Sequence, residues 1–199
     1  RKRLIGQAYW KLETRRLAEL LKQWLQVERA RQGFTVEQRE WTTELTLGPL
    51  SLNLKIDRID LLEGGDRFII DYKSSLSRVQ DWIGDRPAKP QLPLYSAAAP
   101  EQVTALAFAQ VRPRDCKFIG LGDTEVAPGV KTNISQITGD EMEAGDWADL
   151  RREWRNTLEQ LATEFLQGYA ATDPQLAGRC QWCDLGPLCQ QASDSQGRK

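Results

Sequence analysis

The sequence contains no histidine in its 199 residues. This absence excludes a Ser-His-Asp triad, a catalytic Cys-His pair and a histidine-ligated zinc site within the chain. The sequence also contains a single methionine, Met142, and does not begin with one. We therefore expect the chain to be a fragment of a longer protein.

Long apolar runs and a strong charge of one sign are missing too. No stretch reaches the roughly 18 apolar residues that a transmembrane helix needs. The N-terminal RKRLIGQAYWKLE lacks the apolar core of a signal peptide. With 27 basic and 28 acidic residues the formal net charge is -1, so any nucleic-acid contact must come from local basic patches. We expect a folded, cytoplasmic α/β protein with no membrane partner.

Apolar residues at steps of three and four predict the helices. A first helix over residues 1–31, ended by Gly33, has one apolar face that we expect to be buried, formed by Leu17, Leu20, Leu21, Trp24 and Leu25. A second helix covers 91–99 and is closed by Pro100. The last helix is marked by Trp147, Leu150, Trp154, Leu158, Leu161 and Phe165.

Alternating apolar residues predict the strands. Over residues 34–72, TELTL, SLNLKID and FIIDY indicate a meander of antiparallel strands. The run VTALAFAQV at 103–111 is typical of a central strand, 117–126 of a further strand, and 127–143 of a loop. We divide the chain into an N-terminal helix that packs on the core (1–33), the core (34–170), and a C-terminal loop and tail that bears cysteines (171–199).

The stretch RFIIDYKSS ends an apolar strand with two opposite charges, Asp71 and Lys73. Side chains alternate along a strand, so both point to one face. The preceding strand ends in KIDRID, with Asp57 and Asp60, but a two-residue turn at 64–65 would place Asp57 opposite Tyr72, on the wrong face. The apolar parity changes between Ile56 and Ile59, and a bulge near residue 58 or an odd-length turn would bring Asp57 and Asp71 together.

Two carboxylates and a backbone carbonyl on one face suit a hard divalent cation such as Mg2+ or Mn2+. A lysine beside them makes a hydrolytic site, because the cation polarises a phosphate oxygen while Lys73 orients water and offsets charge in the transition state. The alternative is a plain ion pair between Asp71 and Lys73 at the end of a strand. Asp57, fourteen residues upstream of Asp71 across a hairpin, favours the hydrolytic site.

KIDRID, FIIDYKSS and QLPLY resemble, in order and spacing, the G-x-(I/V)-D, D-Y-K and Q-x-x-x-Y motifs of RecB-like nucleases in the PD-(D/E)xK superfamily. The resemblance spans most of residues 34–190 and implies a restriction-endonuclease-like core, a central mixed β-sheet flanked by helices. It implies that Asp57, Asp71 and the Tyr72 carbonyl bind Mg2+ or Mn2+ and that Lys73 is catalytic. It also implies that Gln91 and Tyr95 line the site from the following helix.

One motif of these nucleases is missing from the chain. They usually carry an upstream helix with a glycine and a histidine that completes the metal site, whereas IGQAYWKLE has the glycine and no histidine. Either this motif precedes Arg1 or this member lacks it.

Three cysteines near the C-terminus, in GRCQWCDLGPLC, have a spacing common among metal ligands. Cys180, Cys183 and Cys189 resemble the C-terminal cluster of AddB-like and CRISPR-adaptation nucleases, where a distant upstream cysteine completes a [4Fe-4S] cluster. Cys116 does not match that position, so the fourth ligand would lie outside this chain. The alternatives are a zinc ion, or reduced cysteines that pack a terminal loop.

Single-stranded nucleic acid binds in basic grooves with aromatic platforms. Trp82 and Arg86, with Arg112 and Arg114 after the central strand, are the candidates, and the alternative for Trp82 is core packing. We expect a metal-dependent deoxyribonuclease domain of DNA repair or recombination, with DNA as substrate and a helicase subunit or domain as partner. The alternatives are a non-cleaving DNA-binding or scaffolding module with this fold, and a metal-free interaction domain in which the Asp and Lys residues form an ion network.

Overall fold

The computed structural model describes residues 6–99, 102–139, 141–142 and 144–169. The helices are α1 (Gln7–Arg29), α2 (Gln91–Ala98), α3 (Ile134–Thr138) and α4 (Trp147–Leu166), with a 3-10 turn η1 at Val79–Trp82. The strands are β1 (Phe34–Leu47), β2 (Leu50–Leu62), β3 (Arg67–Lys73), β4 (Val103–Gln110), β5 (Lys117–Gly122) and β6 (Val130–Lys131). None of the helices within these residues is long and apolar enough to cross a membrane.

The chain separates into two compact units, Arg1–Ala162 and Thr163–Lys199, and the boundary falls within α4. Of the second unit the structure describes residues 163–169, which complete that helix and the turn after it. The divisions expected after residues 33 and 170 stay predictions.

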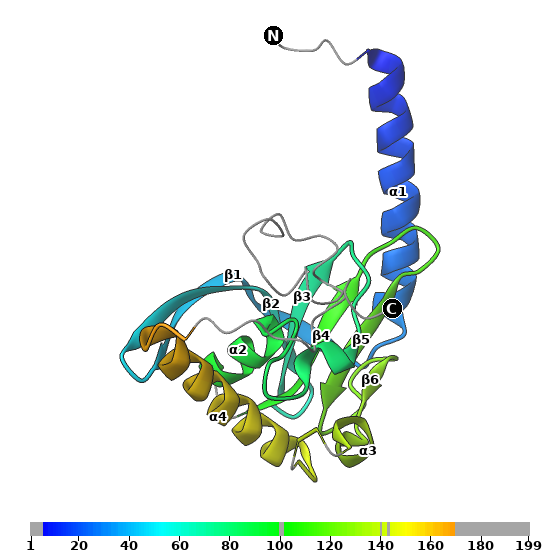
Figure 1. Cartoon of the computed structure of the whole chain (residues 1–199). Helices are drawn as coiled ribbons and strands as arrows, with labels where there is room; N and C mark the ends of the chain where they lie inside the picture. The colour runs from blue at the N-terminus through cyan, green and yellow to red at the C-terminus, as the bar shows by residue number, and fades with distance from the viewer. Residues whose placement is uncertain (1–5, 100–101, 140, 143, 170–199) are drawn as a thin grey trace, which may run out of the picture. The chain divides into compact units, whose positions relative to one another are not determined.

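The strands of the first unit form one six-stranded sheet in the order β1-β2-β3-β4-β5-β6 (Figure 1). The β1–β2, β2–β3 and β4–β5 pairs are antiparallel, whereas the β3–β4 and β5–β6 pairs are parallel. α2 lies between β3 and β4 in the sequence, because a parallel pair needs a crossover connection. The sheet is therefore mixed and flanked by helices, which confirms the expected fold class.

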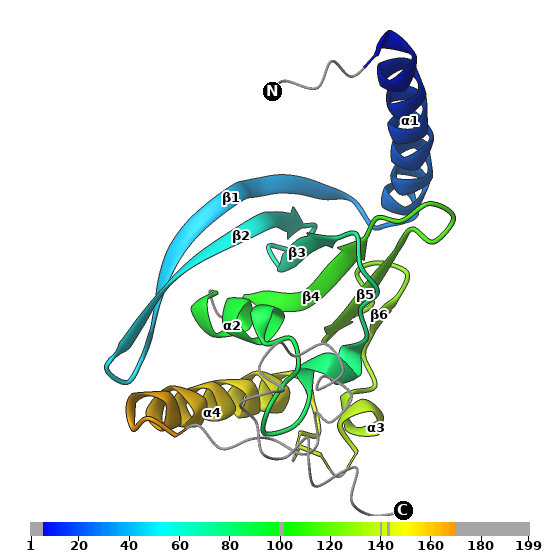
Figure 2. The same ribbon diagram turned by 45° about the horizontal axis from the view of Figure 1, so that its top comes forward.

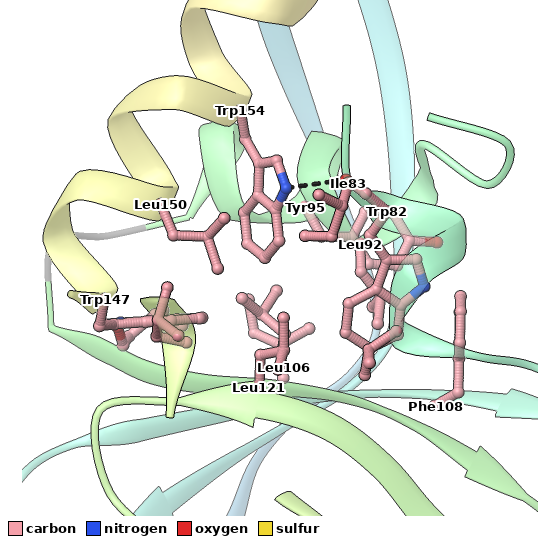
Figure 3. Packing of buried hydrophobic residues seen from close by; sticks show 14 of the residues in the cluster. Trp82, Ile83, Leu92, Tyr95, Leu106, Phe108, Leu121, Trp147, Leu150 and Trp154 are labelled. Atoms are coloured by element: carbon pink, nitrogen blue, oxygen red, sulfur yellow. Dashed lines mark hydrogen bonds between the residues drawn. The ribbon is translucent and has the colours of Figure 1, made fainter. Parts of the chain in front are cut away.

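One face of the sheet is covered by η1, α2 and α4 (Figures 2 and 3). Trp154 of α4 packs on Leu106 and Leu121 of the sheet and donates its indole N–H to the Trp82 carbonyl at 2.9 Å. Trp147 donates to the Val103 carbonyl, also at 2.9 Å. These two hydrogen bonds satisfy the indole N–H groups of two tryptophans whose rings are buried in the apolar core. They hold α4, the last helix predicted from the sequence, against the sheet.

The opposite face is covered by the last turns of α1. Trp24 is the buried residue of this helix and packs edge-on against Phe118 of β5, with ring centroids 5.0 Å apart. The expectation of one continuous buried face is wrong for Leu17, Leu21 and Leu25, which are about half exposed. The reason is that helical spacing identifies an apolar stripe but not how much of it another element covers.

The segment expected to be a loop at 127–143 contains the short elements β6 and α3. Val130 extends the sheet by pairing with Gly120, and Ile134 joins the core on the α4 face. Both elements are too short to show a periodic pattern, and their structure comes from the core that they complete.

Candidate active site

The turn between β2 and β3 sets the register of the site. Gly64 and Gly65 both have positive φ angles, 109° and 94°, which glycine adopts without steric cost. The Leu62 N–H donates to the Asp66 carbonyl at 2.8 Å, so the loop has an odd length of three residues. The register that follows pairs Arg58 with Ile70, and one step further Asp57 lies opposite Asp71. Of the two alternatives that the sequence left open, a bulge near residue 58 or an odd-length turn, the structure has the odd-length turn.

β2 and β3 separate at these two aspartates. Their pairing runs from Leu61–Arg67 to Arg58–Ile70, while the rest of β3 continues to pair with β4 as far as Lys73–Gln110. The Tyr72 N–H bridges the opening gap by donating to Asp57 Oδ2 at 2.9 Å. Because the strands separate, backbone and carboxylate oxygens of both strands face the gap. If the strands had stayed paired, backbone hydrogen bonds between them would have occupied this gap.

β2 also changes face at this point. Ile56 and Ile59, three residues apart, join the same core cluster, which a regular strand cannot achieve. On the neighbouring strand Glu40 has a φ of 50°, an unusual value for a residue other than glycine. The sequence predicted that the apolar residues of this strand change from one face to the other, and the structure has this distortion of β2 next to Asp57.

Asp71 is at the centre of the site and only 1% exposed. Its Oδ1 accepts a hydrogen bond from Gln91 Nε2 at 2.8 Å, and Lys73 Nζ lies 2.6 Å from its Oδ2. The buried Oδ2 is thus paired with the Lys73 ammonium, and the Tyr95 hydroxyl lies 3.4 Å from Oδ1. Burial raises the pKa of Asp71, Lys73 opposes the rise, and Asp57 adds to it.

Gln91 and Tyr95 complete the site from the first turns of α2. They are four residues apart, so both lie on the same side of the helix, and Gln91 Nε2 donates to the Tyr95 hydroxyl at 2.7 Å. Gln91 Oε1 accepts from Lys73 Nζ at 2.6 Å. The Tyr95 hydroxyl donates to the Lys55 carbonyl of β2 at 2.6 Å, and burial raises the pKa of Tyr95 to about 12, so this donor keeps its proton.

The donors present fit a hard divalent cation. Asp71 Oδ2 is a buried oxygen paired with the Lys73 ammonium, and Asp57 lies directly across the gap. The described residues contain no group of three or more acidic, cysteine or histidine side chains that could enclose a metal. A cation held by two carboxylates would therefore complete its shell with carbonyl, water or phosphate oxygens, as Mg2+ commonly does.

The DNA-contact candidates are not brought to this site together. Trp82 is fully buried and packs edge-on against Phe108 at 5.3 Å, so the prediction that it stacks on bases is wrong and the core-packing alternative holds. Arg86 is exposed and Arg112 is half-buried. Arg114 lines a different cavity of about 570 Å³, next to α1, where its backbone N–H donates to Gln23 Oε1 at 2.8 Å.

Two lysines next to the site were missed by the sequence analysis. Lys55 and Lys89 line the cavity that contains Lys73. Lys55 stands two residues before Asp57, and Lys89 two residues before Gln91. Their proximity to the recognised motifs was a signal, but a surface lysine carries no sequence pattern of its own.

The cysteine prediction is not tested at its main positions, since Cys180, Cys183 and Cys189 lie outside the described residues. Cys116 is half-buried at the end of the β4–β5 turn, and its thiol donates to the Arg112 carbonyl at 3.2 Å.

Comparison with known proteins identifies the family. Among solved structures, the chain is similar to one described as "Crystal structure of SSO0001", at 14% identity and a TM-score of 0.43, over 88% of this chain and 69% of that one. A likeness this weak carries no argument. A search of curated proteins finds no significant match. The family model of the PD-(D/E)XK nuclease superfamily matches residues 1–190. That match covers nearly the whole sequence, including β2, β3 and α2 with Asp57, Asp71, Lys73 and Gln91, and the chain therefore belongs to the PD-(D/E)XK nuclease superfamily, with its restriction-endonuclease-like α/β fold.

Proposed function

We propose that the protein is a divalent-metal-dependent deoxyribonuclease that hydrolyses phosphodiester bonds at the gap between β2 and β3. The observation that carries this proposal is the pair of carboxylates Asp57 and Asp71, which lie opposite each other across the gap, with Lys73 paired to the buried Asp71 Oδ2. Burying a carboxylate next to a second carboxylate is costly, and such groups gather mostly at functional sites. Members of this superfamily typically use divalent metals such as Mg2+.

The ligands would be Asp57, Asp71 and the Tyr72 carbonyl. The Tyr72 N–H points across the gap to Asp57, and the N–H and C=O of one strand residue face the same neighbour. The carbonyl is therefore directed into the gap as well. A bound cation would polarise a phosphate oxygen and lower the pKa of a coordinated water.

Lys73 supplies the positive charge of the reaction. Its ammonium is held between Asp71 Oδ2 and Gln91 Oε1, both at 2.6 Å, so it is oriented before substrate arrives. In this position it orients the attacking water and offsets the charge that develops on the phosphate. Gln91 is a positioning residue, because it bonds both Lys73 and Asp71 and fixes their distance.

The test is cleavage of end-labelled single- and double-stranded DNA with Mg2+ or Mn2+. We expect Asp71→Asn and Lys73→Met each to lower the rate by about 10² to 10⁴, the range for a lost catalytic acid-base or electrostatic group. Asp123→Asn and Lys131→Met are the matched controls, since both side chains are exposed on the first unit and away from the site, and their rates should equal that of the original chain.

The second candidate is a DNA-binding or scaffolding module with the same fold, favoured by the absence of histidine from the chain. Calorimetric titration with Mn2+ separates the two. Binding that is lost in Asp71→Asn supports a metal site. If the chain binds DNA, cleaves none and takes up no Mn2+, the nuclease proposal fails and the scaffold replaces it.

A role in repair or recombination beside a helicase, and a cluster at Cys180, Cys183 and Cys189, rest on the RecB-like motifs alone and remain part of the proposal. Absorbance near 400 nm and iron analysis of protein purified without oxygen would test the cluster. Copurification with the host's helicases, compared between the original chain and a variant lacking residues 171–199, would test the partner.

A further inference from the structure

The gap between β2 and β3 opens into a cavity of about 490 Å³ that contains three lysines from three different elements. Lys55 comes from β2, Lys73 from β3, and Lys89 from the segment just before α2. None of the described residues that line this cavity is acidic. Each of these lysines has a carboxylate partner that does not line the cavity, so an anion in the cavity approaches the ammonium groups and not the carboxylates.

The hollow surface continues beyond the catalytic residues. A second cavity of about 490 Å³ shares Asn53, Leu54 and Lys55 with the first and extends over Thr42, Thr43 and Glu44 of β1. The Glu44 carboxylate at its far end accepts a hydrogen bond from the Ser51 hydroxyl. Figure 2 shows β1 and β2 running on past β3 as a long curved hairpin. The two cavities together, from Lys89 through Lys73 and Lys55 to Thr42 and Thr43, are called the lysine groove here.

The side chains of the lysine groove suit a sugar-phosphate backbone better than bases. Lysine ammonium, threonine hydroxyl and asparagine amide groups all donate hydrogen bonds to phosphate oxygens. The aromatic residues that line it offer no free stacking platform, because Phe108 is fully buried and Tyr95 is 4% exposed. Recognition by such a surface carries little sequence information.

We propose that the lysine groove binds a single DNA strand through its phosphates, with Lys55 and Lys89 on the phosphates that flank the scissile one. The strand then leaves along Asn53, Thr42 and Thr43 of the β1–β2 hairpin. This inference rests on the proposed nuclease function and adds the path of the substrate to it.

Both lysines have an N–H group to offer a phosphate. Lys55 is paired with Glu40, and both side chains are more than half exposed, so water already competes with this ion pair. Lys89 lies 3.0 Å from Asp81 Oδ2 and donates to the Leu76 carbonyl at 2.8 Å. These contacts direct its ammonium beside the groove and leave it a third N–H to donate.

The experiment is fluorescence anisotropy of labelled single-stranded DNA, with Mg2+ present and Asp71→Asn as background so that the strand stays intact. The variants are Lys55→Gln, Lys89→Gln and both together. Lys117→Gln is the matched control, because Lys117 is likewise an exposed lysine ion-paired with a carboxylate, Asp115, but lines the cavity beside α1. Lys89→Arg keeps the positive charge. It therefore distinguishes an effect of losing the charge from an effect of local unfolding around residue 89.

Each lost phosphate contact lowers the slope of log K against log salt by about 0.7 for a single strand. We therefore expect the slope to become shallower by about 0.7 in each single variant to Gln and by about 1.4 in the double variant. The slope should not change in Lys117→Gln or Lys89→Arg. Equal slopes in all variants, or a background protein that binds no DNA, would overturn the lysine groove. Cleavage by the original chain decides the proposed function separately, since binding here is measured without it.

Discussion

Two aspartates of the same sheet, Asp60 and Asp71, are almost completely buried but have opposite surroundings. Asp60 accepts three hydrogen bonds from two arginines, two from Arg58 at 2.6 and 2.9 Å and one from Arg31 at 2.7 Å. Glu28 completes this group by accepting from both arginines. Asp71 is paired with one lysine and accepts hydrogen bonds from the Gln91 amide and, at 3.4 Å, from the Tyr95 hydroxyl.

The difference in charge is as informative as the difference in hydrogen bonds. The Asp60 group has two arginines and two carboxylates, so it is neutral, and the Arg31 guanidinium also lies 4.0 Å from the Phe34 ring centroid. The Asp71 group has two carboxylates, Asp57 and Asp71, and one lysine. One negative charge therefore remains without a partner in the group, and a divalent cation is the ligand that would compensate it. We infer that the first group holds α1 on the sheet and the second is kept open for a ligand.

The largest effect should follow from breaking the complete group. Asp60→Ala leaves Glu28 as the one carboxylate facing both Arg31, whose side chain is fully buried, and Arg58. One positive charge of the group is then uncompensated, and we expect a loss of about 3–5 kcal/mol in the free energy of unfolding. Urea unfolding followed by circular dichroism measures it, with exposed Asp123→Ala as the control. A double variant, Arg31→Met with Asp60→Leu, should lose less than Asp60→Ala. An equal or greater loss would contradict the assignment of the cost to an unpaired buried charge.

A smaller effect, opposite in sign, is expected at Asp71 without metal. Its pKa is raised in the folded protein, so the folded state holds the proton more tightly than the unfolded chain does. Stability from this group therefore falls as the pH rises from the ordinary aspartate pKa through the raised one. Asp71→Asn has no such titration and should be at least as stable as the original chain at pH 7.

Adding Mg2+ should reverse that order. Mg2+ at about a hundred times its Kd should stabilise the folded original chain by about 2.7 kcal/mol. Asp71→Asn lacks the site and should not be stabilised. Melting curves of both proteins at pH 7, with EDTA and with Mg2+, provide the measurement. An equal shift of both melting temperatures by Mg2+ would show that the cation binds elsewhere.

The comparison also explains what the sequence could and could not predict. Asp57, Asp71 and Lys73 were recognisable because strand parity and a local turn determine their shared face, and Gln91 and Tyr95 because a helix brings residues four apart together. Asp60 stands in the same KIDRID stretch as Asp57, but its role depends on Arg31, which is 29 residues away in sequence. A partner so distant appears only once the fold is formed.

Side-chain exposure is hard to predict for a related reason. The predicted stacking residue Trp82 and the expected buried leucines of α1 were assigned from residue type and spacing. Exposure depends on which element lies against a residue, and α4 covers Trp82 while Leu17 and Leu21 of α1 remain about half exposed.

The smallest effects are expected for two tyrosine hydroxyls, one at each aspartate. The Tyr95 hydroxyl is buried and donates to the Lys55 carbonyl at 2.6 Å, whereas the hydroxyl of the more exposed Tyr72 accepts from Arg58 at 2.9 Å. Tyr95→Phe should cost about 1 kcal/mol of unfolding free energy, because the carbonyl loses its donor where β2 leaves β3. Tyr72→Phe should cost less, since Arg58 keeps Asp60 and Glu28 as partners.

The same pair of variants separates structure from catalysis. Tyr95 bonds Gln91, which positions Lys73, so Tyr95→Phe should lower kcat by less than about tenfold and leave KM for DNA unchanged. Tyr72→Phe should leave both constants unchanged, because its hydroxyl lies with the Asp60 group on the other face of the sheet. If Tyr72→Phe lowered kcat as much as Tyr95→Phe, the two groups would be coupled through the backbone of β3, and the division between a holding group and an open site would be wrong.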